Sequence, residues 1–175
     1  SAVTFAIDAL SAAGAPIIDI DLPGEFDSIL AHHAIIMAVE AAQTHHDHFA
    51  ANPDDYSSAV KGLIERGMAT PRSTFAAALD HQQKLCRDVG DCFRGVDVLI
   101  CPATTGTAPD LSTTGSPAMN SPWSYTGLPT VSMPAQCAAN GLPLGVQLVG
   151  RIRNDSTLLD SAIWCESKIA ADFKP

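Results

Sequence analysis

The sequence has few charged and few aromatic residues, and it lacks a long apolar run. Charged residues make up 17% of the 175 residues and aromatic residues 6%, whereas 46% are hydrophobic. A typical soluble domain has about 25% charged residues. The hydrophobic content excludes a disordered tail, and without an apolar run of 18 residues we expect no membrane partner. The net charge of −9 argues against nucleic acid as a partner, because phosphate contacts need clustered Lys and Arg.

Paired cysteines and nucleotide-binding motifs are also missing. The five cysteines include no C-x-x-C pair, which argues against a disulfide framework or a structural zinc site. No phosphate-binding loop or dinucleotide fingerprint occurs, so we expect no cofactor. The start of the chain carries no basic-then-apolar signal sequence, and together with the cysteine usage this favours a cytoplasmic location.

The missing charge is concentrated in one stretch. Residues 95–150 hold only two charged side chains, Asp97 and Asp110, but seven of the twelve prolines and seven of the twelve glycines. Apolar runs at 96–101, 128–135 and 144–149 lie between these prolines and glycines. The pattern predicts strands and shaped loops that either the rest of the chain or a partner shields from water.

Hydrophobic periodicity predicts an α/β fold with a mixed sheet and flanking helices. Helices are expected around residues 3–10 with a stop at Gly14, over 25–50, from Asn52 to about Gly67, from Thr70 to about Gly95, over 118–126, and from a cap at Asp155 onward. Strands are expected at 17–22, 97–101, 130–136 and 145–150. Asn140-Gly141 is typical of a type I′ turn and predicts that the last two strands are antiparallel neighbours.

Histidines and one glutamate are the first candidates for a site. Five of the six histidines fall in the helix predicted over 25–50, where His45 and His48 stand three residues apart and could share a metal. No HExxH pattern or further ligand at a diagnostic spacing accompanies them, so we predict no metal and favour a solvated helix end. Glu40 lies in the apolar stripe of the same helix; it either faces a substrate cavity or, as we favour, caps a loop or pairs with Arg.

No catalytic residue can be assigned from spacing. The sequence has no G-x-S-x-G elbow, and a Ser/Lys mechanism needs a lysine kept neutral by burial. All four lysines are expected to be solvated: Lys61, Lys84, Lys168 and Lys174.

Three segments of the uncharged stretch nevertheless resemble the amidase signature family. Residues 95–105 (GVDVLICPATT) are similar to its D-L-x-x-P-T strand and loop, and residues 120–129 (NSPWSYTGLP) to its N-x-P-W/F…G-x-P segment. Residues 131–134, followed by residues 140–150, resemble its P-x-x-x-P-x-G…G-L-P-x-G-x-Q-x-x-G ending. The final helix also matches, and the first 94 residues are compatible, so the resemblance covers nearly the whole chain.

This resemblance implies that residues 1–175 are one structural unit, the C-terminal part of an amidase domain. Family members hydrolyse amides with a serine, a second serine joined through a cis peptide, and a lysine, all in a front half that this sequence does not contain. The part present would complete the central sheet and wall one side of the acyl pocket for a small-molecule amide. The fragment alone would be inactive, with an exposed apolar face that could form a homo-oligomer.

The resemblance also suggests substrate-binding residues for that pocket wall. These candidates are Thr104, Thr105, Asn120 and Trp123. The alternative, which we favour for Asn120 and Trp123, is that Asn120 caps the short helix and Trp123 fills the core. A second hypothesis for the whole chain is a self-contained binding or interaction module, with metal bound through the histidine-rich helix.

Overall fold

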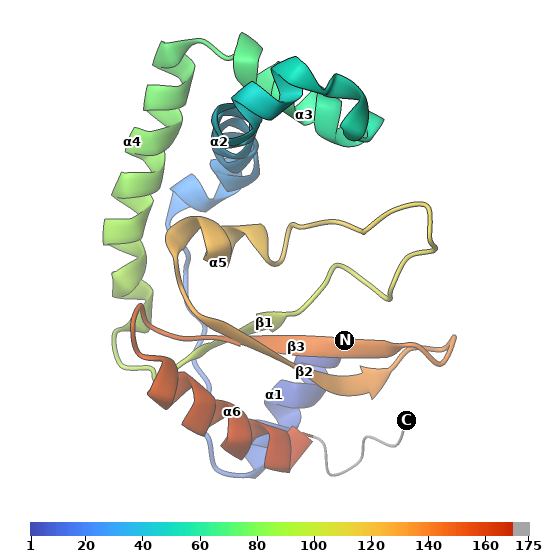
Figure 1. The fold of residues 1–175 in the computed structure, drawn as a ribbon. Coiled ribbons are helices and arrows are strands. Elements are labelled where there is room, and N and C mark those ends of the chain that lie inside the picture. Colours follow the sequence, from blue (N-terminus) through green and yellow to red (C-terminus); the bar gives the residue numbers. More distant parts are fainter. Residues whose placement is uncertain (170–175) are drawn as a thin grey trace. The chain divides into compact units, whose positions relative to one another are not determined.

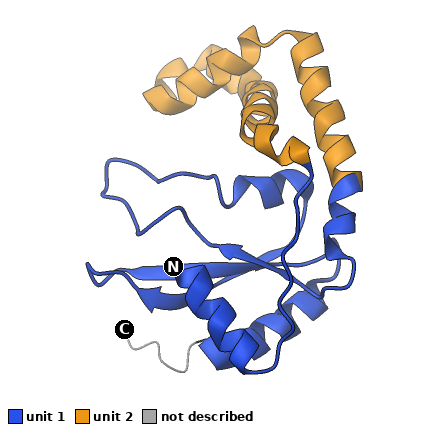
Figure 2. Ribbon diagram, turned by 180° about the vertical axis from the view of Figure 1, so that it is seen from behind, with its two compact units in different colours: residues 1–23, 88–175 blue, residues 24–87 orange. Residues whose placement is uncertain are grey.

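The computed structural model describes residues 1–169, which divide into two compact units (Figure 2). Unit 1 consists of residues 1–23 and the chain from Asp88 onward, and unit 2 of residues 24–87. That both units belong to one larger domain stays a prediction of the sequence. None of the helices in the described part of the chain combines the length and the apolar character needed to cross a membrane.

Unit 1 is built on a three-stranded sheet with the order β1-β3-β2. The strands are β1 (Leu99–Pro102), β2 (Thr130–Cys137) and β3 (Pro143–Val149). The α/β class with flanking helices is confirmed. The sequence predicts a mixed sheet, whereas both strand pairings between the described residues are antiparallel. The long connection from β1 to β2 leaves these strands running in the same direction, but β3 lies between them.

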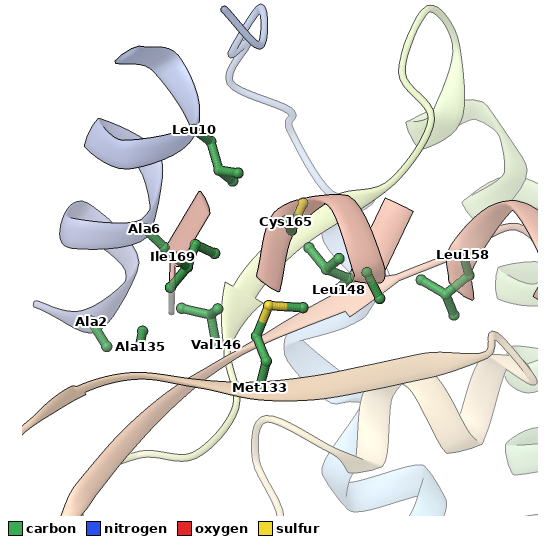
Figure 3. Packing of buried hydrophobic residues seen from close by; sticks show 11 residues of the cluster. Ala2, Ala6, Leu10, Met133, Ala135, Val146, Leu148, Leu158, Cys165 and Ile169 are labelled. Carbon is green, nitrogen blue, oxygen red and sulfur yellow. The ribbon is translucent and has the colours of Figure 1, made fainter. Parts of the chain in front are cut away.

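Two helices cover one face of this sheet. Helix α1 (Ala2–Ala12) and helix α6 (Asp155–Ile169) both contact β2 and β3, whereas the short helix α5 (Ser121–Thr126) lies on the opposite side (Figure 1). The core between the sheet and the two helices contains aliphatic side chains from all of these elements (Figure 3). Its central members are Ala6, Leu10, Met133, Ala135, Val146, Leu148, Leu158, Ala162 and Ile169. Burial of such side chains is the main source of stability here, because each large one contributes about 1.5–3 kcal/mol.

Three local predictions for unit 1 are wrong. Residues 17–22 form no strand, and Ile17 and Ile18 are exposed rather than buried against a sheet. The turn at Asn140-Gly141 is not type I′, because only Gly141 has a positive φ (79°) and that turn type needs two. Asp155 is the first residue of α6 rather than its cap, since the Asn154 carbonyl accepts the first helical bond, from Leu158 N at 3.2 Å.

Unit 2 consists of helices α2 (Ile29–Ala51) and α3 (Ser58–Ala69), with α4 (Arg72–Asp88) ending at its border. The sequence places several helix ends wrongly, because short 3-10 segments replace α-helix at Gly24–Ser28 (η1), Pro53–Asp55 (η2) and Val89–Phe93 (η3). Helix α3 therefore begins at Ser58, after Ser57, whose hydroxyl accepts a hydrogen bond from Val60 N at 3.4 Å. The helix that the sequence predicts to start at Asn52 is therefore capped five residues later, at Ser57.

A single glycine allows α2 and α3 to pack closely. A Cβ atom at Gly67 of α3 would lie 1.9 Å from the backbone oxygen of Ala38 and 2.8 Å from the Cβ of Ala42, both on α2. Only a residue without a side chain fits this crossing. The buried residues of α2 are Ile29, Ile36, Ala38, Val39 and Ala42.

Candidate functional site

The candidate site lies on the sheet face turned away from α1 and α6. Val146 and Leu148 of β3 point into the core, so Gln147 between them points to the other face. The register places Gln147 directly opposite Cys101 of β1 and Ser132 of β2. Residues directly opposite each other project to the same face. A polar row, Cys101–Gln147–Ser132, therefore crosses all three strands.

Gln147 is a buried polar group with three contacts. Its side chain is 1% exposed, and Nε2 lies 2.7 Å from the carbonyl oxygen of Met119, 3.5 Å from that of Pro102 and 3.4 Å from Cys101 Sγ. Pro102 and Met119 stand at the two ends of the long loop between β1 and α5. One side chain from the central strand thus holds together both ends of this loop.

Cys101 and Trp123 extend this polar cluster to helix α5. Burial raises the pKa of the Cys101 thiol, and hydrogen bonds with Gln147 and Trp123 act in the opposite direction. The thiol is therefore protonated at neutral pH, which makes it a poor nucleophile. Trp123 is 6% exposed, in agreement with the interpretation of this residue as a core residue.

The other predicted wall residues lie at the two ends of the same loop. Thr104 and Thr105 follow β1 after Ala103 and are exposed, and the Thr104 hydroxyl donates to the carbonyl oxygen of Gly106 at 2.6 Å. Asn120 is exposed at the N-cap position of α5, but its side chain makes no capping hydrogen bond. The expectation that its side chain caps the helix is therefore wrong. Whether these residues bind substrate stays a prediction.

A close backbone approach fixes the point where the loop leaves the sheet. The Ala103 N–H donates to the carbonyl oxygen of Gly145 at 3.1 Å. A Cβ on Gly145 would lie 2.9 Å from the Met133 carbonyl oxygen and 3.3 Å from the Cβ of Ala103. Gly145 therefore has a geometric role, because a larger residue would push these backbones apart.

The described lysines contact acidic or aromatic side chains. Lys61 pairs with Asp54 at 2.9 Å, and Lys84 pairs with Glu25. Lys168 is exposed, with its Nζ 6.0 Å from the ring centre of Trp164. Lys174 lies outside the described residues.

The weak metal candidates pack around a tyrosine in unit 2. His45 Nδ1 lies 3.2 Å from the Tyr56 hydroxyl, and His48 Nε2 lies 3.0 Å from Asp55 Oδ2. Both imidazole rings meet the Tyr56 ring at steep angles, with centroids 5.4 and 5.6 Å away. Among residues 1–169, no group of three or more His, Cys, Asp or Glu side chains is placed to hold a metal. Glu40 is exposed on α2, away from the buried residues of that helix.

Sequence reasoning missed the importance of Gln147 and Ser132. A single Gln inside the apolar run at 144–149 was the available signal, because an isolated polar residue in a buried strand needs hydrogen-bond partners. The identity of those partners depends on strand register, which the sequence does not reveal.

Comparisons with known proteins agree with the fold and the motifs. Residues 1–159 match the family model described as Amidase. The putative amidase AmiD of Mycobacterium tuberculosis is 30% identical over 125 residues, which covers 65% of this chain and 26% of that protein. A mitochondrial glutamyl-tRNA(Gln) amidotransferase subunit from Xenopus laevis is 28% identical over 96% of this chain and 38% of its own length.

A solved amidase structure superposes with a TM-score of 0.87 at 25% identity, covering 96% of this chain and 41% of that one. The chain thus spans between about a quarter and two fifths of the length of these three proteins. The family match, extending over most of the residues and agreeing with the superposed fold, shows that this chain belongs to the amidase family.

Proposed function

We propose that this chain is the C-terminal part of an amidase-type hydrolase that cleaves carboxylic amides to an acid and ammonia or an amine. The observation that carries the proposal is the family match over residues 1–159, combined with coverage of only 26–41% of the matched proteins. The described residues supply a sheet and shaped loops, and none of them is assigned to the serine–serine–lysine set that the family resemblance places in the front half of the domain. The chain alone therefore has no turnover.

The contribution of this part to the enzyme is one wall of the acyl pocket. Thr104, Thr105, Asn120 and Trp123 form this wall, held by the hydrogen bonds of Gln147 to both ends of the loop. The row of Cys101 and Ser132 beside Gln147 continues the wall across the sheet. The substrate is a small-molecule amide, and the enzyme works in the cytoplasm.

The two edges of the sheet support its completion by further strands on one side. Strand β2 is interrupted by Pro134, which has no N–H, and by a bulge between Pro134 and Gln136. Both features discourage pairing along an edge. Strand β1 has its proline, Pro102, only at its last position, so its apolar residues 99–101 all keep an N–H group. The rest of the amidase sheet therefore continues from β1.

An apolar ridge on α6 supports association of the isolated chain. Leu159, Ile163 and Trp164 are 52%, 67% and 40% exposed. Neighbouring exposed apolar side chains favour contact with another molecule. We expect the isolated chain to form homo-oligomers through such surfaces.

Hydrolysis assays on simple aliphatic and aryl amides test the proposed function. The 175-residue chain should give no turnover by itself. The chain joined to the part of the M. tuberculosis protein outside the matched region should hydrolyse amides, with that part alone as the control. Enzyme-like turnover by the isolated chain would falsify the proposal, and so would a joined protein no more active than the control.

A further inference from the structure

Two stacked imidazole rings join helix α4 to the start of helix α2 in unit 2. His81 of α4 lies on His32 of α2 with ring centroids 3.9 Å apart and ring planes 6° apart. His32 Nδ1 lies 2.9 Å from the Ser28 carbonyl oxygen, and His81 Nε2 lies 2.9 Å from the Ser28 hydroxyl. Because a carbonyl oxygen only accepts, Nδ1 of His32 carries a proton in this arrangement.

The charged groups that act on His81 come from three elements. His32 lies on α2, Glu25 on η1, and Lys84 one turn further along α4. The Glu25 carboxylate and a hydrogen bond to the Glu25 backbone favour the protonated form of His81, whereas Lys84 and His32 oppose it. Glu25 also forms an ion pair with Lys84. The Glu25 carboxylate is therefore already matched by a cation, and a second imidazolium in the stack would add positive charge beyond that balance.

We propose that the cluster of Ser28, His32 and His81 is a pH-sensitive joint, which holds α4 against the start of α2 while the rings are neutral and opens when both rings are protonated. Two stacked rings tolerate one positive charge, because a cation can lie over a π face. Two positive charges at this separation repel each other, and the half-buried position limits screening by water. The chemistry requires only the uptake of protons.

The direction of the pH effect follows from the environment of His81. Burial, and then the neighbouring His32, lower the pKa of His81 below its ordinary value of about 6.5. The folded unit therefore binds fewer protons than the unfolded chain as the pH falls below that value. The contribution of His81 to stability is present above about pH 6.5 and is lost as the pH falls through its lowered pKa.

Hydrogen exchange on the intact chain at pH 7.5 and pH 5.5, corrected for the chemical exchange rate, tests this joint. The amides of α4 should lose several-fold more protection at pH 5.5 than those of α1 and α6, because proton uptake by His81, whose pKa is lowered in the folded unit, favours the open joint. His81→Gln cannot titrate but keeps a side chain that can hydrogen-bond to Ser28, so its α4 should lose this extra pH dependence. His46→Gln is the matched control, because His46 lies on α2 with 68% of its side chain exposed.

An NMR titration of the wild-type histidines gives a readout that does not depend on a variant folding. The Cε1–H signal of His81 should titrate below the ordinary histidine pKa of about 6.5. The proposal is overturned if His81 titrates at or above that value, or if α4 of folded His81→Gln loses as much protection at low pH as the wild type. Neither measurement involves amide hydrolysis, so the outcome is independent of the proposed function.

Discussion

Replacement of Gly67 by alanine should separate helices α2 and α3. The added Cβ would stand 1.9 Å from the Ala38 oxygen and 2.5 Å from the Ala38 carbonyl carbon. Both are backbone atoms, so no side-chain rotation can relieve the contact. The helices must move apart, and the surrounding contacts of α2 with α3 are lost with them.

The size of the effect is a balance between overpacking and helix propensity. Forcing an extra carbon into a packed site costs about 1–3 kcal/mol, and a backbone clash this short belongs at the upper end. Alanine in place of glycine in a helix raises the free energy of unfolding by about 1 kcal/mol, because alanine has the higher helix propensity. We therefore expect Gly67→Ala to lower the free energy of unfolding by about 2 kcal/mol, roughly a thirtyfold change in the equilibrium constant.

Gly62 provides the matched control within the same helix. A Cβ at this position would meet only the mobile end of Arg66, at 3.5 Å. Gly62→Ala should thus raise the free energy of unfolding by about 0.5–1 kcal/mol through helix propensity alone. Urea unfolding followed by far-UV circular dichroism measures both variants, with a midpoint shift of about 1 M expected for Gly67→Ala. If the two variants are equally stable, the close helix crossing at Gly67 does not exist.

Three further outcomes are expected. Gln147→Met removes the buried amide that bonds the Met119 carbonyl and should lower the free energy of unfolding by about 1–3 kcal/mol. In a Trp164→Phe background, increased quenching of Trp123 fluorescence by acrylamide would report the loosened loop. Unchanged quenching would contradict the role of Gln147 in positioning the loop. Isothermal titration with zinc should give no heat, because His45 and His48 are each engaged with a protein group; heat that disappears in the doubly alanine-substituted variant would restore the metal hypothesis. A thiol reagent should modify the two exposed cysteines of the folded chain first and reach the buried Cys92 and Cys165 only on unfolding; equal rates for all five would argue against the core. The two exposed cysteines are Cys86 and Cys137.

The elements that the sequence predicts well are those with a strong apolar period. Helix α1 and strands β2 and β3 follow from it, because one face of each is buried in a single core. The antiparallel pairing of β2 with β3 is predicted from Asn140-Gly141 and is confirmed, although the turn is not type I′. Local sequence patterns are less informative where packing between elements decides which face of a helix is buried. The stripe drawn through Glu40 is displaced from the buried face of α2, since that face is set by the position of α3 against Ala38 and Ala42.

The candidate site shows the same division between local and long-range information. The loop ends at Thr104 and Asn120 can be located from motifs, because each motif is contiguous in the sequence. The cluster that holds them cannot, because Gln147 and Cys101 are 46 residues apart and meet only in the register of β1 with β3. A shift of one residue in that register would turn Gln147 into the core and Leu148 out of it.

The low charge of residues 95–150 now has a physical interpretation. Burial accounts for the strands, but the loop over 104–117 is largely exposed and still carries only one charged residue, Asp110. Leu111 at its tip has no covering contact in this chain, with a relative exposure of 106%. Exposure combined with the loss of charged residues is typical of the core of an interface rather than of a free surface. The loop extends on the α5 side of the sheet (Figure 1), the side that the proposed function assigns to the acyl pocket. Charge is therefore scarce in this stretch because, in the complete hydrolase that we propose, both its strands and its loop are covered.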